Sequence, residues 1–90
     1  MRENSAVPLR LIETIPHPEC RICIYSYNDK YILEVEIGIY KQTFKMSHDS
    51  VSGVGDIRKL VDARFMESCM QRFHSMREAF QDAKKNLQTP

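Results

Sequence analysis

The sequence predicts an α+β domain in which a three-stranded antiparallel β-meander is packed by a short helix and one long C-terminal helix. Residues 20–46 alternate between apolar and polar side chains and are interrupted by two turn-forming dipeptides, the pattern of consecutive hairpins. From Ala63 onwards, apolar residues recur every three or four positions, as on one face of a helix. A chain of 90 residues is the size of one domain, so residues 1–90 are expected to form a single unit.

The first hairpin can be placed in register from its loop. If residues 28–29 form a two-residue loop, Tyr27 lies opposite Lys30. Apolar residues then meet on one face of the strand pair: Ile24 with Leu33, Ile22 with Val35, and Cys20 with Ile37. A shift of one residue would set Ile24 against Glu34 and divide the apolar residues between the two faces. The pattern therefore favours the unshifted register.

The second hairpin is predicted at Gly38-Ile39, a dipeptide that suits a tight loop with glycine first. The third strand, Tyr40–Met46, then returns beside the second strand. Gln42 is the one polar residue on the apolar side of this third strand. The meander therefore covers residues 20–46, and its other face carries mainly charged and polar side chains.

The segment before the meander leaves two arrangements open. Residues 1–7 are polar and are predicted to be disordered, as are residues 88–90 at the other end. Leu9–Ile15 alternates weakly, so it forms either a fourth strand at the N-terminal edge of the sheet or a strap over the core. Pro16 and Pro18 end regular strand pairing there.

The helical part is predicted over residues 56–87. Asp56 caps a short helix that ends at Val61, and Asp62 forms a second cap or a bend. The long helix then runs from Ala63 to about Asn86. Its apolar stripe consists of Met66, Cys69, Met70, Phe73, Met76, Phe80, Ala83 and Leu87. This stripe is expected to cover the apolar face of the sheet.

The long helix exceeds the length of the sheet beneath it. A helix of about 24 residues spans about 36 Å, whereas strands of about seven residues span about 23 Å. The apolar stripe continues into the excess length, where a Phe or Leu left in water forgoes roughly 1.5–3 kcal/mol of burial. Three alternatives for what covers these apolar residues stay open: the Leu9–Ile15 segment, a second copy of the chain, or a different protein.

The favoured interpretation is a non-catalytic protein-interaction module that forms a homodimer through this end of the helix, because symmetric pairing is the commonest assembly of soluble chains. A heterologous protein partner on the same surface is the other option. The predicted partner interface comprises Phe73, Met76, Phe80, Ala83 and Leu87.

The outer face of the sheet supports an alternative function. Aromatic and basic side chains gather there, and such residues stack on bases and contact phosphates of RNA or single-stranded DNA. These residues are Arg21, Tyr25, Tyr27, Lys41 and Lys45. Glu34 and Glu36 lie among them and oppose phosphate. The net charge of +1 and the pI of 7.7 are also below the strongly basic values typical of nucleic-acid-binding domains.

Candidate catalytic and metal-binding motifs have simpler structural explanations. Cys20 and Cys23 form a Cys-x-x-Cys motif, but in a strand their side chains point to opposite faces, Cys20 into the core and Cys23 to a partly exposed position. Residues 48–50, His-Asp-Ser, are adjacent in a polar loop, whereas a catalytic triad is assembled from separate elements. The glycine-containing residues 52–55 lack the lysine of a phosphate-binding loop. No catalytic residue, metal or cofactor is predicted, and the chain is not expected to be an enzyme.

Composition and cysteine usage point to the cytoplasm. No apolar run approaches the ~20 residues of a membrane span, and no basic-then-apolar leader opens the sequence. The chain has three cysteines, an odd number, which is typical of free thiols in a reducing compartment. No membrane contact is expected.

Several short stretches resemble a family of small bacterial proteins with no assigned activity. The stretches are Ile15-Pro16-His17-Pro18-x-Cys20, Tyr31-Ile32, Gln42-Thr43-Phe44-Lys45 and Asp56-Ile57-Arg58, with Phe65 and Phe73. The resemblance covers about residues 15–76. It implies a bacterial cytosolic protein and assigns no functional residue.

Overall fold

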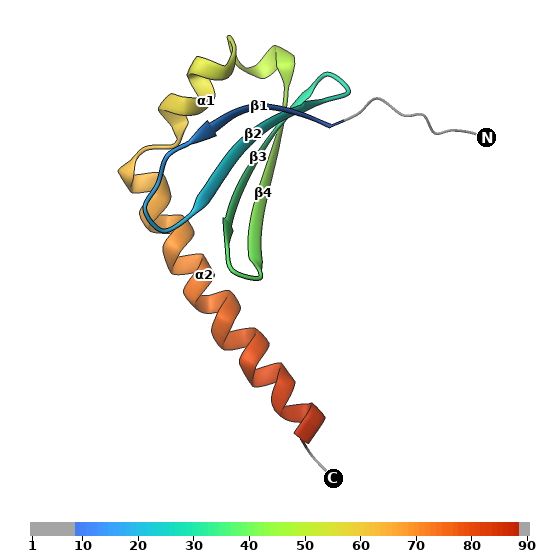
Figure 1. Ribbon diagram of the computed structural model, residues 1–90, viewed down its shortest axis with the longest axis vertical. Helices are drawn as coiled ribbons and strands as arrows, with labels where there is room; N and C mark the ends of the chain where they lie inside the picture. Colours follow the sequence, from blue (N-terminus) through green and yellow to red (C-terminus); the bar gives the residue numbers. More distant parts are fainter. Residues whose placement is uncertain (1–8, 89–90) are drawn as a thin grey trace, which may run out of the picture.

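The computed structural model describes residues 9–88, which form one four-stranded antiparallel sheet with α1 and α2 on one of its faces (Figure 1). The strands follow chain order across the sheet: β1 (Arg10–Ile15), β2 (Arg21–Tyr27), β3 (Lys30–Ile37) and β4 (Tyr40–Ser47). The helical elements are η1 (His48–Ser50), α1 (Val54–Leu60), α2 (Ala63–Lys84) and η2 (Lys85–Gln88). The predicted α+β fold, a meander with a short and a long helix, is confirmed. The disorder predicted for residues 1–7 and 89–90 lies outside the described residues.

Both predicted hairpins have the expected register. β2 and β3 pair so that Tyr27 lies opposite Lys30. The loop residues Asn28 and Asp29 have φ values of 49° and 62°, the left-handed conformation that a two-residue loop requires and that Asn and Asp tolerate. The loop between β3 and β4 turns at Gly38, whose φ of 57° carries no side-chain penalty in glycine. Loop chemistry and alternation therefore act together to fix the sheet.

The segment before the meander forms a fourth strand rather than a strap. β1 pairs antiparallel with β2, with Ile15 opposite Ile22 and Leu11 opposite Tyr25. The register shifts at Ile12, where a β-bulge bends this edge strand. β1 and β4 are therefore the two opposite edges of the sheet.

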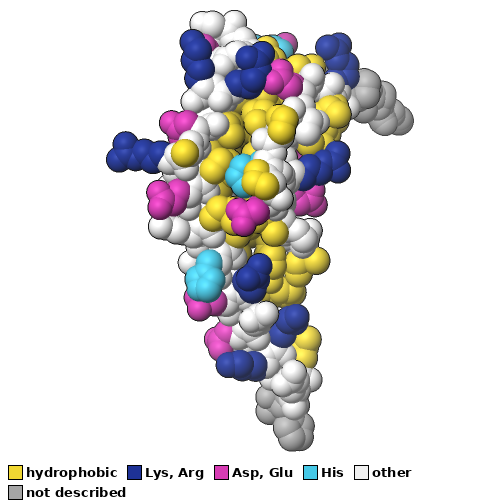
Figure 2. Space-filling model, turned by 60° about the vertical axis from the view of Figure 1, so that its left-hand side comes forward, with side chains coloured by type: hydrophobic (Ala, Val, Ile, Leu, Met, Phe, Trp, Pro, Cys, Tyr) yellow, Lys and Arg dark blue, Asp and Glu magenta, His cyan; other side chains and the backbone are white. Residues whose placement is uncertain are grey.

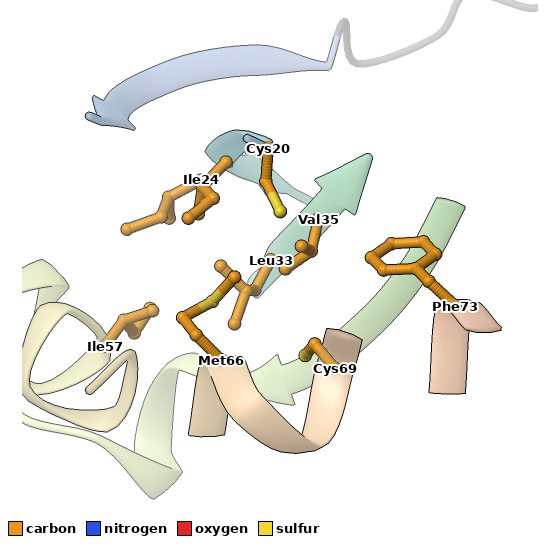
Figure 3. Packing of buried hydrophobic residues seen from close by; sticks show 9 residues of the cluster. Cys20, Ile24, Leu33, Val35, Ile57, Met66, Cys69 and Phe73 are labelled. Carbon is orange, nitrogen blue, oxygen red and sulfur yellow. The ribbon is translucent and has the colours of Figure 1, made fainter. Parts of the chain in front are cut away.

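The core lies between the inner face of the sheet and one side of the helices (Figure 3). Alternate residues of β2 and β3 meet α2 and the buried residue of α1. The core comprises Cys20, Ile22, Ile24, Leu33, Val35, Ile57, Met66, Cys69 and Phe73. In the close view Met66 lies beside Leu33, and Phe73 lies on the side of Val35. Burial of a large apolar side chain of this kind contributes about 1.5–3 kcal/mol.

The helix boundaries differ from the prediction at the start of α1 and at the end of α2. α1 begins at Val54, so Asp56 lies in its first turn and does not cap it; the cap residue is Gly53. The Asp56 carboxylate accepts a hydrogen bond from the Ser52 backbone N–H at 2.8 Å, which lowers the pKa of this carboxyl. α2 ends at Lys84 and continues as η2, which includes Gln88, a residue expected to be disordered.

Of the cap and the bend that the sequence leaves open at Asp62, the cap is the one found. Its carboxylate accepts a hydrogen bond from the Phe65 backbone N–H at 2.8 Å and so satisfies one of the unpaired donors at the start of α2. This cap fixes the point at which the chain leaves the short helix and enters the long one.

The outer face of the sheet is less exposed than the alternation of residues suggests. Cys23 lies on this face but is only 2% exposed, so the expectation that it is partly exposed is wrong. Thr14 of β1 lies opposite Cys23, and Arg21 Nε donates a hydrogen bond to Cys23 Sγ at 3.4 Å. The fourth strand places β2 inside the sheet, where neighbouring side chains cover the thiol. Ile32, on the same face, is also buried.

Candidate interaction surface

The two halves of α2 have different surroundings. The packed half, residues 63–76, contributes Met66, Cys69 and Phe73 to the core. The projecting half, residues 77–88 of α2 and η2, extends beyond the sheet, as Figure 1 shows. Every side chain of residues 77–88 is exposed. The predicted excess of helix over sheet is therefore present.

A polar network attaches the packed half to β4. Gln42 is buried among apolar residues, and its Nε2 donates a hydrogen bond to the Cys69 backbone carbonyl at 2.9 Å. Its Oε1 accepts a hydrogen bond from Arg72 Nε at 2.8 Å. The polar residue that does not fit the strand pattern is thus paired through both ends of its amide, which removes the cost of burying it.

A sulfur contact joins the packed half to the start of β2. Cys20 Sγ lies 3.7 Å from Met70 Sδ, and Cys20 is buried in the core. Burial raises the pKa of the Cys20 thiol, and the nearby Glu19 and Cys69 raise it further. The packed half is therefore held by contacts to both β2 and β4.

The projecting half carries large apolar side chains on its surface. Phe80 is 44% exposed, and Leu87 is 83% exposed. Figure 2 shows hydrophobic surface where the projecting helix leaves the body of the molecule. The Phe80 ring has two neighbours: Tyr40 in an edge-to-face contact, with ring centroids 6.3 Å apart, and the Lys84 ammonium 5.1 Å from its centroid. These contacts cover part of Phe80 and leave the rest in water.

The loop between β3 and β4 also carries an exposed apolar side chain. Ile39 follows Gly38 in the loop and is 75% exposed. It is adjacent in sequence to Tyr40, which contacts Phe80. The contact between Tyr40 and Phe80 places the loop beside the projecting half, and we call the apolar residues of both the helix-end patch. It consists of Ile39, Tyr40, Met76, Phe80, Ala83 and Leu87.

The helix-end patch overlaps the predicted partner interface but is not identical to it. Four of the five predicted residues are members, with Met76 half-buried at its upper end. The fifth, Phe73, is 3% exposed and belongs to the core, so its side chain offers no free surface. Ile39 and Tyr40 were not predicted, although an apolar residue in a two-residue loop is itself a signal, because such a loop has little to pack against.

The described part of the N-terminal segment does not cover this patch. β1 lies at the edge of the sheet opposite to β4, and Phe80 contacts Tyr40 of β4. Leu9 and Leu11 are themselves exposed on that far edge. Of the three covers that the sequence leaves open, residues 9–15 are therefore excluded.

The candidate nucleic-acid residues do share one face of the sheet. The registers place Arg21, Tyr25 and Tyr27 on the same side as Lys41 and Lys45. Lys41 forms an ion pair with Glu34 at 3.4 Å, and Arg21 bonds to Cys23, so two of the three cations have partners within the sheet. Desolvation, followed by a hydrogen bond to Cys23, raises the pKa of the Tyr25 hydroxyl. The face is therefore mixed in charge.

The remaining motifs do not converge. Ser50 Oγ donates to the Ser47 carbonyl, and the His48 ring contacts Tyr31 at a centroid distance of 4.3 Å. His48 Nε2 also lies 3.3 Å from Ser26 Oγ. Among residues 9–88 no group of three metal-ligating side chains and no pocket is found. Likewise, none of the helices in residues 9–88 combines the length and the apolar character needed to cross a membrane.

Comparison of the chain with protein-family models, with curated proteins and with solved structures gave no match. The fold and the surface thus define the class: a small α+β domain with a four-stranded meander and a projecting C-terminal helix with apolar surface.

Proposed function

We propose that this chain is a non-catalytic protein-interaction module that forms a homodimer through the helix-end patch. One observation carries the proposal: among the described residues, Phe80 and Leu87 of the projecting helix and Ile39 of the loop beside it are large apolar side chains that remain exposed. Single exposed apolar residues are normal in a monomer, but a contiguous group marks an interaction site.

A second copy of the chain is the simplest occupant. Two-fold dimers are the commonest assemblies of soluble chains, and they need only one patch that fits itself. A projecting helix also allows the approach of another copy without a clash between the two sheets. A different protein could use the same patch, and the experiment below separates the two cases.

The proposal includes a reducing compartment, namely the cytoplasm of a bacterial cell. Cys20, Cys23 and Cys69 are free and buried, which is the usual state of cysteines where disulfides do not form. The bacterial origin depends only on the resemblance of short sequence stretches described above.

The test is the molar mass of the wild-type chain across a concentration series, by light scattering and sedimentation equilibrium. We expect a monomer–dimer equilibrium that Phe80→Asp shifts towards the monomer, with Kd raised roughly 30-fold or more, because an interface aromatic is replaced by a charge. Ser75→Asp is the matched control, because Ser75 is exposed on the same helix and is not a member of the helix-end patch.

The Ser75→Asp chain should dimerise as the wild type does. A wild-type chain that stays monomeric at the highest soluble concentration would exclude the homodimer.

Binding of RNA or single-stranded DNA on the outer face is the second candidate. The shared face of Tyr25, Tyr27 and Lys45 supports it, whereas Glu34 and Glu36 on the same face oppose it. Titration with a random oligonucleotide pool at low salt distinguishes this function from dimerisation.

A further inference from the structure

The end of the apolar stripe, from Met76 onwards, has a spacing that matches its own reverse. Its four members follow one another at intervals of four, three and four residues: Met76, Phe80 and Ala83 in α2, and Leu87 in η2. The midpoint of this pattern falls between Gln81 and Asp82. Met76 and Leu87 lie equally far from the midpoint on either side, and Phe80 and Ala83 do so closer in. A two-fold axis through the midpoint therefore superposes apolar positions on apolar positions.

We infer that the dimer is an antiparallel pair of helices related by a two-fold axis between Gln81 and Asp82, an inference that rests on the proposed function. Met76 then faces the partner's Leu87, and Phe80 faces the partner's Ala83, each contact occurring twice. Alternating intervals of three and four residues are those of seam positions in paired helices. The large Phe80 side chain meets a small alanine, so the two fit without crowding.

The fold favours the antiparallel direction over the parallel one. The stripe of the projecting half continues the face that the packed half turns to the sheet, where Phe73 is already buried. In a parallel pair, the N-terminal part of the partner helix would clash with the β3–β4 hairpin of the first chain. An antiparallel partner instead places its sheet at the far end, beyond Leu87. The C-terminal end of the partner's helix then lies against Met76, beside the hairpin of the first chain.

The hairpin loop adds contacts where the partner helix ends. Tyr40 packs against Phe80, and the exposed Ile39 lies next to it in the chain. The partner's Leu87, facing Met76, arrives at this loop. The otherwise unexplained apolar residue in a two-residue loop therefore acquires a contact in the dimer.

The size of this interface suits a weak, reversible dimer. The paired segment of about 12 residues, from Met76 to Leu87, is about 18 Å long, and with the hairpin loops the buried area is on the order of 1,000 Å², the lower end for specific interfaces. At the rim, Arg77 comes near the partner's Lys84, a contact between like charges that weakens the pair further. The geometry therefore predicts exchange in the micromolar range or weaker rather than a permanent assembly.

Distances between spin labels on paired chains test this arrangement. Ser75 and Asp82 are exposed, lie one heptad apart on the same side of α2 and are absent from the proposed seam. Each is replaced by cysteine in turn, and Cys20, Cys23 and Cys69 stay unlabelled because they are buried. The unsubstituted chain, treated with the same label, is the control for this selectivity.

The antiparallel pair predicts unequal distances. Two Asp82→Cys labels lie about 2 Å apart along the helix axis, and two Ser75→Cys labels about 20 Å apart, so the second label pair gives the clearly longer distance. Equal distances at the two positions would mean a parallel pair and would overturn the inference while the proposed dimer stands. A sample that sediments as a dimer but gives no measurable distance at Asp82→Cys would overturn it as well. A chain that sediments as a monomer removes the proposed function and this inference together.

Discussion

The packed and projecting halves of α2 share one sequence pattern but differ in burial. In both halves apolar residues recur every three or four positions. Phe73 in the packed half is buried against the sheet, whereas Leu87 in the projecting half is almost fully exposed. The difference comes from the sheet, which ends near Tyr40, and not from the helix. An amphipathic pattern therefore indicates that the apolar face of a helix is suited to burial, but it does not identify the molecule that buries it.

The polar contacts of the two halves differ in the same way. In the packed half, Arg72 reaches a buried amide of β4, and Asp62 caps the first turn. In the projecting half the ion pairs are local to the helix surface, such as Asp82 with Lys85 at 3.5 Å. Exposed pairs of this kind contribute little stability. The projecting half is therefore held as a helix by its own turns and by continuity with the packed half.

The largest expected effect is a difference in stability between matched truncations in the two halves. Phe73→Ala removes a core ring and should lower the free energy of unfolding by about 3–5 kcal/mol. Leu87→Ala removes an exposed side chain and should change the unfolding of the monomer by less than about 0.5 kcal/mol, while weakening the dimer. Urea unfolding followed by circular dichroism, at concentrations below the dimer Kd, measures both. Equal losses in the two variants would contradict the division of α2 into two halves.

A smaller effect is expected at the polar attachment of the packed half. Gln42→Ala should lower the free energy of unfolding by about 1–3 kcal/mol, because it removes the hydrogen bonds to Cys69 and Arg72 and leaves a cavity. Thr43→Ala is the control, since Thr43 is the next residue of β4 and faces outward. The same urea titration compares the two. If Thr43→Ala is as damaging as Gln42→Ala, strand propensity and not the buried amide explains the loss.

The meander could be predicted from the sequence because short-range chemistry determines it. The loop at Asn28 and Asp29 sets one register, and a one-residue slip would expose the apolar set. The same holds for the turn at Gly38. These constraints lie within a few residues of one another, so no distant contact is needed to interpret them.

Features that depend on distant contacts were predicted less well. Cys23 reads as half-exposed from strand alternation, and only the pairing of β1 beyond β2 buries it. Asp56 is a residue type that commonly caps helices, but α1 starts earlier, at Val54. The Asp56 carboxylate instead accepts a hydrogen bond from the Ser52 backbone N–H. The projecting stripe could be predicted from length alone. The contribution of Ile39 to the same surface could not, because it requires knowing where the hairpin loop meets the helix.

The smallest expected effect is a dependence of stability on alkaline pH that belongs to the packed half. The Cys20 thiol contacts Met70 of α2, and burial, with Glu19 and Cys69, raises its pKa above the ordinary value of 9.0. The folded state therefore holds this proton more tightly than the unfolded state. The resulting stability is fully present below pH 9.0 and is lost as the pH rises through the folded-state pKa.

Cys20→Ala should abolish this loss, so the free energy of unfolding falls less steeply above pH 9.0 than in the wild type. The pKa of Tyr25 is also raised, from 10.0, mainly by desolvation, so Tyr25→Phe serves as the control and should keep the Cys20 step while removing only the contribution of Tyr25. Urea titrations at a series of alkaline pH values measure all three chains. An unchanged slope in Cys20→Ala would show that the contact between the thiol and the packed half contributes nothing to the pH dependence, and that ionisation elsewhere in the sheet governs it.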